Sequence, residues 1–186
     1  MHYKLFMILL GCRPKGRYTE QHDIFFGIAK ELKDLVQDIK AYWKNSGKIH
    51  LDAFREVTNV DGYQIMIVNK TEIETTRQNL FFLNLGGYKE NHFDEFHYKM
   101  LIVANEKGEA IKAAKQSAFY LHTGFGKIAT SHIDDKYGVD VDDIFEIKDI
   151  LSDEIKNKFS ISISTEKNNN LPEDKMNLGY FKIDEL

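Results

Sequence analysis

Short apolar runs along the first 30 residues predict two buried strands. The runs cover residues 3–10 and 23–29, and both are rich in Leu, Ile and Phe. Runs of this length bounded by glycine and polar residues are typical of strands buried in a sheet. The sequence therefore predicts that the chain begins with a pair of buried strands.

A helix and two further strands are expected after this pair. Leu32, Leu35 and Ile39 recur at spacings of three and four, which predicts a helix over about 31–44. Strands are then predicted at 49–57 and 63–68, joined through a turn that ends at Gly62. The predicted order of this unit is ββαββ.

The same pattern recurs further along the chain. Shifting the sequence on itself so that position 5 meets position 80 aligns 5–29 with 80–104 without a gap, and Gly11, Glu20 and His22 then meet Gly86, Glu95 and His97. Similarity at a fixed spacing is the signature of a repeated unit. Beyond a gap, the alignment matches 49–52 with 131–134 and Val60-Asp61 with Val141-Asp142.

The rest of the chain is assigned from this repeat. The second unit is expected to hold strands near 80–85 and 96–104, a helix from Ala110 to Leu121, and strands near 128–133 and 144–150. The segment 152–158 is predicted to form one or two helical turns. The runs 159–164 and 178–183 are predicted to pair as a hairpin.

Together these elements predict an α+β fold. We expect two tandem ββαββ repeats, at 1–70 and 78–150, in a pseudo-twofold arrangement of mainly antiparallel sheet with helices packed on it. The C-terminal helical turn and hairpin at 151–186 would cover a sheet edge. The whole is expected to form one compact structural unit.

Composition narrows the classes of function. The chain has 186 residues, 42% of them hydrophobic and 29% charged, which is typical of a globular protein. A net charge of −4 disfavours nucleic acid as a partner, and no apolar stretch approaches the roughly 20 residues that span a membrane. The single cysteine favours a reducing compartment, so a cytoplasmic location is expected.

Histidine and acidic residues form pairs at a spacing of two. Side chains two apart on a strand lie on one face, and imidazole with carboxylate suits a divalent metal or general acid–base chemistry. Because Asp135 adds another acid to the second unit, the candidate metal ligands are placed there: Glu95, His97, His132 and Asp134. Glu20 with His22 and His50 with Asp52 are the matching pairs of the first unit. The simpler alternative is that each pair is a structural ion pair.

The loop after the first strand offers another candidate site. Arg13, Lys15 and Arg17 could bind an anion, although a solvated basic loop explains them equally well. The corresponding loop of the second unit is mostly acidic, which suggests a homodimer held by loops of opposite charge. These basic neighbours would also favour a thiolate at Cys12, whereas the alternative for Cys12 is a small residue needed at a strand end.

These motifs resemble a known bacterial family, the domain of unknown function 1543, which often occurs as two copies in one chain. The residues that carry the resemblance are Leu10-Gly11, Thr19 to Asp23, Leu83 to Tyr88, Glu95-Phe96-His97 and Ser131 to Asp135. The resemblance implies a bacterial origin and a tandem architecture, and it implies no activity.

The sequence is compatible with three kinds of function. We expect a module that binds a small ligand or another protein without catalysis. The first alternative is a metal-dependent, hydrolase-like enzyme that uses the His and acid pairs, and the second is a self-assembling structural protein.

Overall fold

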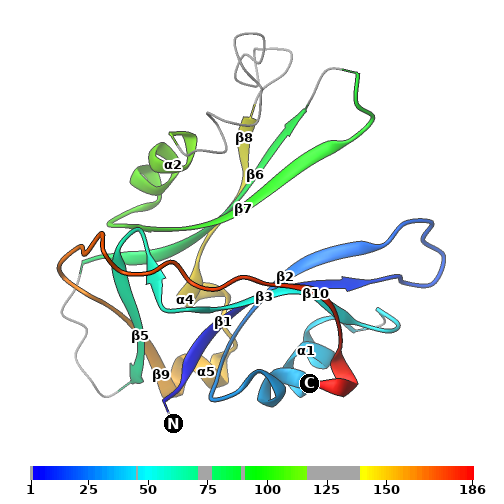
Figure 1. The fold of residues 1–186 in the computed structure, drawn as a ribbon, viewed down its shortest axis with the longest axis horizontal. Coiled ribbons are helices and arrows are strands. Elements are labelled where there is room, and N and C mark those ends of the chain that lie inside the picture. The colour runs from blue at the N-terminus through cyan, green and yellow to red at the C-terminus, as the bar shows by residue number, and fades with distance from the viewer. Residues whose placement is uncertain (1, 45, 71–76, 89–90, 117–138) are drawn as a thin grey trace. The chain divides into compact units, whose positions relative to one another are not determined.

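The computed structural model describes residues 2–44, 46–70, 77–88, 91–116 and 139–186, and it divides the chain into two compact units (Figure 1). Unit 1 comprises Met1–Thr76 and Leu151–Leu186, and unit 2 comprises Arg77–Ile150. The C-terminal segment thus belongs to the same unit as the N-terminus. Helices combine with antiparallel sheets, as expected of an α+β fold.

Unit 1 is built on a four-stranded antiparallel sheet in the order β10-β3-β1-β2. Its strands are β1 (Lys4–Cys12), β2 (Gln21–Ala29), β3 (His50–Val57) and β10 (Asn177–Lys182). Alternate residues of β1 are buried on one face, where they pack in one core with the short helices η1 (Leu32–Leu35) and α1 (Val36–Tyr42). The predicted helix is therefore present but begins with a 3-10 turn.

Three short strands form a second sheet of unit 1, in the order β4-β5-β9. The strands are β4 (Asn59–Val60), β5 (Tyr63–Asn69) and β9 (Phe159–Ile163). Asp61 and Gly62 join β4 to β5 with φ values of 56° and 83°, which suits the tight hairpin turn that glycine favours. Helix α5 (Asp153–Lys158) precedes β9, and a last 3-10 turn, η2 (Ile183–Glu185), follows β10.

Unit 2 contains a three-stranded antiparallel sheet in the order β7-β6-β8. The strands are β6 (Asn79–Tyr88), β7 (Glu95–Ala104) and β8 (Val139–Glu146). Helix α2 (Lys107–Lys115) buries Ala110 and Ala114 in a core with alternate residues of β6. The predicted strand at 128–133 lies outside the described residues.

Two predictions about the second half of the chain are wrong. The run 144–150 is not one strand, because β8 ends at Glu146 and helix α4 (Ile147–Ile150) follows; the spacing of Ile144, Ile147 and Leu151 is helical. The predicted C-terminal hairpin does not form either. Strand β9 pairs with β5 and β10 pairs with β3, since alternation identifies a strand without identifying its partner.

The central strand of each unit has the same register with its neighbours. Gly11 on β1 lies opposite both His22 and His50, and Gly86 on β6 lies opposite His97 and Asp140. Strand β3, the other neighbour of β1, and strand β8, the other neighbour of β6, each carry one extra residue near this point. Such a β-bulge changes the direction of the side chains. The extra residue is Asp52 in β3 and Asp142 in β8.

Candidate metal centre

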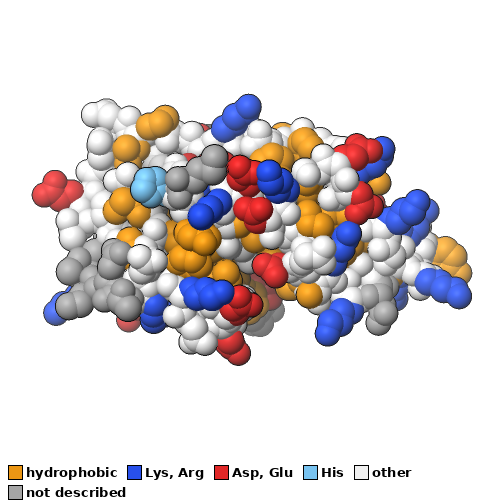
Figure 2. All heavy atoms as spheres, turned by 90° about the horizontal axis from the view of Figure 1, so that it is seen from below, with side chains coloured by type: hydrophobic (Ala, Val, Ile, Leu, Met, Phe, Trp, Pro, Cys, Tyr) orange, Lys and Arg blue, Asp and Glu red, His pale blue; other side chains and the backbone are white. Residues whose placement is uncertain are grey.

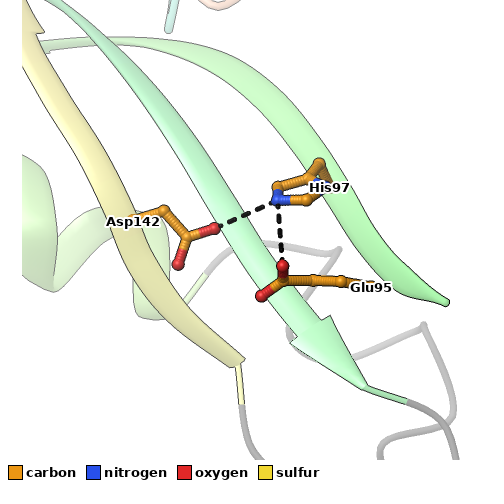
Figure 3. A group of neighbouring side chains, drawn as sticks. All are labelled: Glu95, His97 and Asp142. Carbon is orange, nitrogen blue, oxygen red and sulfur yellow. Dashed lines mark ion pairs between the residues drawn. The ribbon is translucent and has the colours of Figure 1, made fainter. Parts of the chain in front are cut away.

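Unit 2 brings one imidazole and two carboxylates together on the sheet face opposite helix α2. We call Glu95, His97 and Asp142 the unit 2 cluster. One ligand atom from each side chain lies within 4.8 Å of the others, the only such His/Cys/Asp/Glu group found in the part of the chain that the structure describes. Figure 3 shows Glu95 and His97 on β7 and Asp142 on β8 pointing toward one another above β6.

The spacing of these atoms suits a divalent ion. His97 Nε2 lies 3.7 Å from Glu95 Oε2 and 3.4 Å from Asp142 Oδ2. Ligand atoms about 2.1 Å from one ion at tetrahedral angles are separated by about 3.4 Å. The side chains are 33% to 39% exposed, so solvent reaches the cluster and an exogenous ligand has access to it.

Glycine on the central strand makes room for the bulged acid. A Cβ at position 86 would lie 2.7 Å from Asp142 Cγ and closer still to its Oδ2. Gly86 is not among the described glycines with positive φ, so close approach and not backbone conformation is the reason for glycine here.

Unit 1 carries a related group at the same register positions. We call Glu20, His22, His50 and Asp52 the unit 1 cluster. Each imidazole faces one oxygen of each carboxylate: His22 Nε2 lies 3.2 Å from Asp52 and 3.7 Å from Glu20, and His50 Nε2 lies 3.2 Å from both. A Cβ at Gly11 would lie 2.6 Å from Asp52 Oδ2 and closer still to His50 Nε2. The two His and acid pairs of unit 1 therefore converge on one sheet face, because their strands flank β1.

The candidate ligands of unit 2 are only partly those expected. Glu95 Oε2 and His97 Nε2 lie 3.7 Å apart, whereas His132 and Asp134 lie outside the described residues; a metal-binding role for all four stays a prediction. Sequence reasoning missed Asp142, which the register places at the position of Asp52. The signal that could have found it is the spacing of Asp140 and Asp142, the same as that of His50 and Asp52.

The basic loop stays a candidate anion site. Arg13, Lys15 and Arg17 lie in the segment that joins β1 to β2, and within the described residues none of their side chains forms an ion pair with an acid. The loop is a turn in which Arg17 N donates to Pro14 O and Gly16 has a φ of 83°.

Cys12 is not an activated thiol. Its side chain is fully buried in the unit 1 core, and burial, followed by the nearby Glu20 carboxylate, raises the pKa of the thiol. The expectation that neighbouring basic residues favour its thiolate is wrong, and its role as a small core residue at a strand end fits the structure.

Comparison with known proteins supports the resemblance found in the sequence. The model of the Domain of Unknown Function (DUF1543) family matches residues 17–67. The matched segment contains all four members of the unit 1 cluster. No curated protein matches the chain.

One solved structure is similar along nearly the whole length of the chain. It is the crystal structure of a protein Il1583 from Idiomarina loihiensis, with a TM-score of 0.64 and 20% sequence identity over 97% of this chain and 98% of that one. This similarity shows the fold alone. Among the helices in the described ranges, none has the length and apolar character needed to cross a bilayer.

Proposed function

We propose that this protein is a divalent-cation-binding module whose exchangeable ion is held by the unit 2 cluster. The observation that carries the proposal is the convergence of Glu95, His97 and Asp142 within 4.8 Å. One imidazole with two carboxylates suits manganese, iron or zinc, and three protein ligands leave positions for water or a small ligand. The sequence predicted a small-ligand or protein-binding module without catalysis, and it placed a metal ion in the enzyme alternative; the proposal combines the binding function of the first with the metal of the second.

A hydrolase-like reaction is the second candidate, and the exposure of the unit 2 cluster favours it. A water molecule on a bound ion would be more acidic than free water, and the oxygen of Glu95 or Asp142 that does not hold the ion would accept its proton. Metal binding is required by both candidates, so it is tested first.

We also infer that the two units are divergent copies of one bacterial domain. The shared register of Gly11 and Gly86, and the shared bulge at Asp52 and Asp142, support a common origin. The face in Figure 2 carries basic and acidic side chains interspersed, which supports partners other than nucleic acid.

The test uses the full chain after treatment with a chelator. Titration with Mn²⁺, followed by the electron paramagnetic resonance signal of the free ion, is expected to show a bound ion that His97→Ala loses. The matched control is His92→Ala, because His92 lies on the same hairpin, packs edge-on against Phe96 and is outside the cluster. A wild-type chain that binds no Mn²⁺ or Zn²⁺ at about 1 mM, or equal binding by wild type and His97→Ala, would overturn the proposal.

A further inference from the structure

We propose that the unit 1 cluster is a four-ligand, zinc-class structural metal site that differs from the three-ligand unit 2 site in ligands and in function. The inference rests on the proposed function, because it takes metal binding by the related unit 2 cluster as its starting point. Its own evidence comes from unit 1: the number of donors, the buried His50 imidazole and Asp52 oxygen, and the aromatic ring that packs against His50.

The unit 1 cluster supplies four protein side chains where the unit 2 cluster supplies three. The four N···O separations between its imidazoles and carboxylates run from 3.2 to 3.7 Å. Each carboxylate turns one oxygen to His22 and the other to His50, so an ion would bind only after the carboxylates turn toward a common point. Four protein ligands complete the coordination of zinc, as is usual in structural sites.

Zinc binding would draw the unit 1 ligands closer together. Among these described residues, no three ligand atoms from different side chains all lie within 4.8 Å of one another. Each imidazole already lies within 3.7 Å of both carboxylates. The Glu20 side chain is 43% exposed, which leaves it free to move toward an ion.

The additional imidazole of unit 1 is buried. The His50 side chain is only 5% exposed, whereas Glu20 and His22 are 43% and 44% exposed, about as much as Glu95 and His97 in unit 2. Asp52 Oδ2 is buried and has no hydrogen-bond partner among the described residues, although His22 Nε2 is 3.2 Å away. A buried carboxylate oxygen without a hydrogen bond is costly, and coordination to an ion would remove that cost.

Strand β10 lies beside the unit 1 cluster. It pairs with β3 through a register shift between Leu178 and Phe181, and the Tyr180 ring from this segment stacks on the His50 imidazole with centroids 4.2 Å apart. Tyr180 is 66% exposed, and its ring packs against one face of the His50 imidazole. Within the described sheet of unit 2, β8 is an edge strand, so no strand corresponds to β10 there.

The ligand types also differ between the clusters. The unit 1 cluster has two imidazoles and two carboxylates, and the unit 2 cluster has one imidazole and two carboxylates. Imidazole favours zinc over manganese, while carboxylates suit manganese and magnesium. We therefore expect zinc to fill unit 1 first and manganese to bind in unit 2.

The experiment measures zinc binding and thermal stability on the same full-length chain. Chelator-treated protein is titrated with Zn²⁺ by calorimetry, and native mass spectrometry counts the ions bound. We expect two ions of unequal affinity. His50→Ala should lose the tighter one together with the rise in Tm at one equivalent of zinc, while His97→Ala should keep the tighter ion and that rise. His2→Ala is the control for loss of a histidine outside either cluster.

Two further variants keep the test decisive. Asp52→Asn changes one ligand without changing its shape, and it replaces His50→Ala if circular dichroism shows that His50→Ala does not fold. Tyr180→Leu should retain two zinc ions but weaken the tighter site about 10-fold to 100-fold, so that chelator removes that ion faster.

The outcomes separate this inference from the proposed function. A single zinc ion that is lost in His97→Ala refutes the unit 1 site and leaves metal binding by unit 2 intact. Two ions of equal affinity, or a tighter ion that is lost in His97→Ala, refute the difference between the sites. A chain that binds no divalent ion refutes the proposed function, and this inference with it.

Discussion

Replacing Gly86 by alanine should weaken metal binding in unit 2 at least about 10-fold while leaving the fold nearly as stable as before. The new Cβ would lie 2.7 Å from Asp142 Cγ and 2.8 Å from its Oδ1. Ordinary contact begins at 3.4 Å, so Cγ must move by about 0.7 Å (3.4 − 2.7), and Oδ2 by more. Metal sites tolerate errors of about 0.2 Å in ligand distance, so Asp142 would no longer reach the ion.

The expected loss of affinity is at least about 10-fold, in the range measured when a site loses support for one ligand. The stability change should stay within about 1 kcal/mol, because the displaced group is the end of a partly exposed side chain and alanine is less costly than glycine in a strand. Mn²⁺ titration and urea unfolding of Gly86→Ala measure the two effects separately. Gly108→Ala, on helix α2, is the control, since a Cβ there meets only Glu106 Oε1 at 3.7 Å.

A double-mutant cycle makes this test specific. If Gly86 acts only by giving Asp142 room, Gly86→Ala should have no further effect on affinity in an Asp142→Ala background. Unchanged Mn²⁺ affinity in the single variant would refute the reasoning about the bulge and the glycine. A further loss in the double variant would show that Gly86 acts through another group.

Two other predictions follow from unit 1. Cys12 should resist thiol reagents in the native chain at pH 8 and react fully after unfolding in urea, because the side chain is buried and its pKa is raised; rapid native labelling would contradict its place in the core. Asp174→Ala should lower the free energy of unfolding by about 2 to 3 kcal/mol with unchanged Mn²⁺ affinity. The Asp174 side chain is 2% exposed and accepts hydrogen bonds from Thr58 N at 3.1 Å and Thr58 Oγ1 at 2.6 Å. A cost in urea unfolding no larger than that of an ordinary surface substitution, about 0.5 kcal/mol, would refute that role.

Most strands could be predicted because their periodicity is local. The runs at 3–10 and 23–29 became β1 and β2, and the spacing of Leu35 and Ile39 located the helix that covers them. Which strands pair with one another could not be predicted in the same way. The run 159–164 was placed correctly as a strand, but its partner β5 lies far earlier in the chain, and alternation carries no information about so distant a partner.

In unit 2, the candidate ligands on β7 could be predicted from the sequence, and the candidate ligand on β8 could not. The Glu-x-His pair keeps a constant distance from the glycine, so a single ungapped alignment finds it in both units. The connection that leads to β3 in unit 1 and to β8 in unit 2 differs in length. The chain from Gly11 to His50 is shorter than the chain from Gly86 to Asp140. The sequence alignment matched residues 50–52 to residues 132–134 because both have the pattern His-x-Asp. The hydrogen-bonded register instead places residues 140–142 beside β6.

Glycine at positions 11 and 86 indicates that both units preserve the convergence of their acidic side chains. Glycine within a strand costs roughly 0.5 to 1 kcal/mol relative to alanine, and neither Gly11 nor Gly86 has the positive φ that would require it. A structural ion pair on a sheet face needs no such space, since surface pairs contribute little and adopt many geometries. Both units instead place a bulged carboxylate directly above a glycine and within 3.2 to 3.4 Å of an imidazole nitrogen. The proposed metal ion would need both carboxylates close to one imidazole, and it would account for the bulge, the glycine and the Glu-x-His pair together.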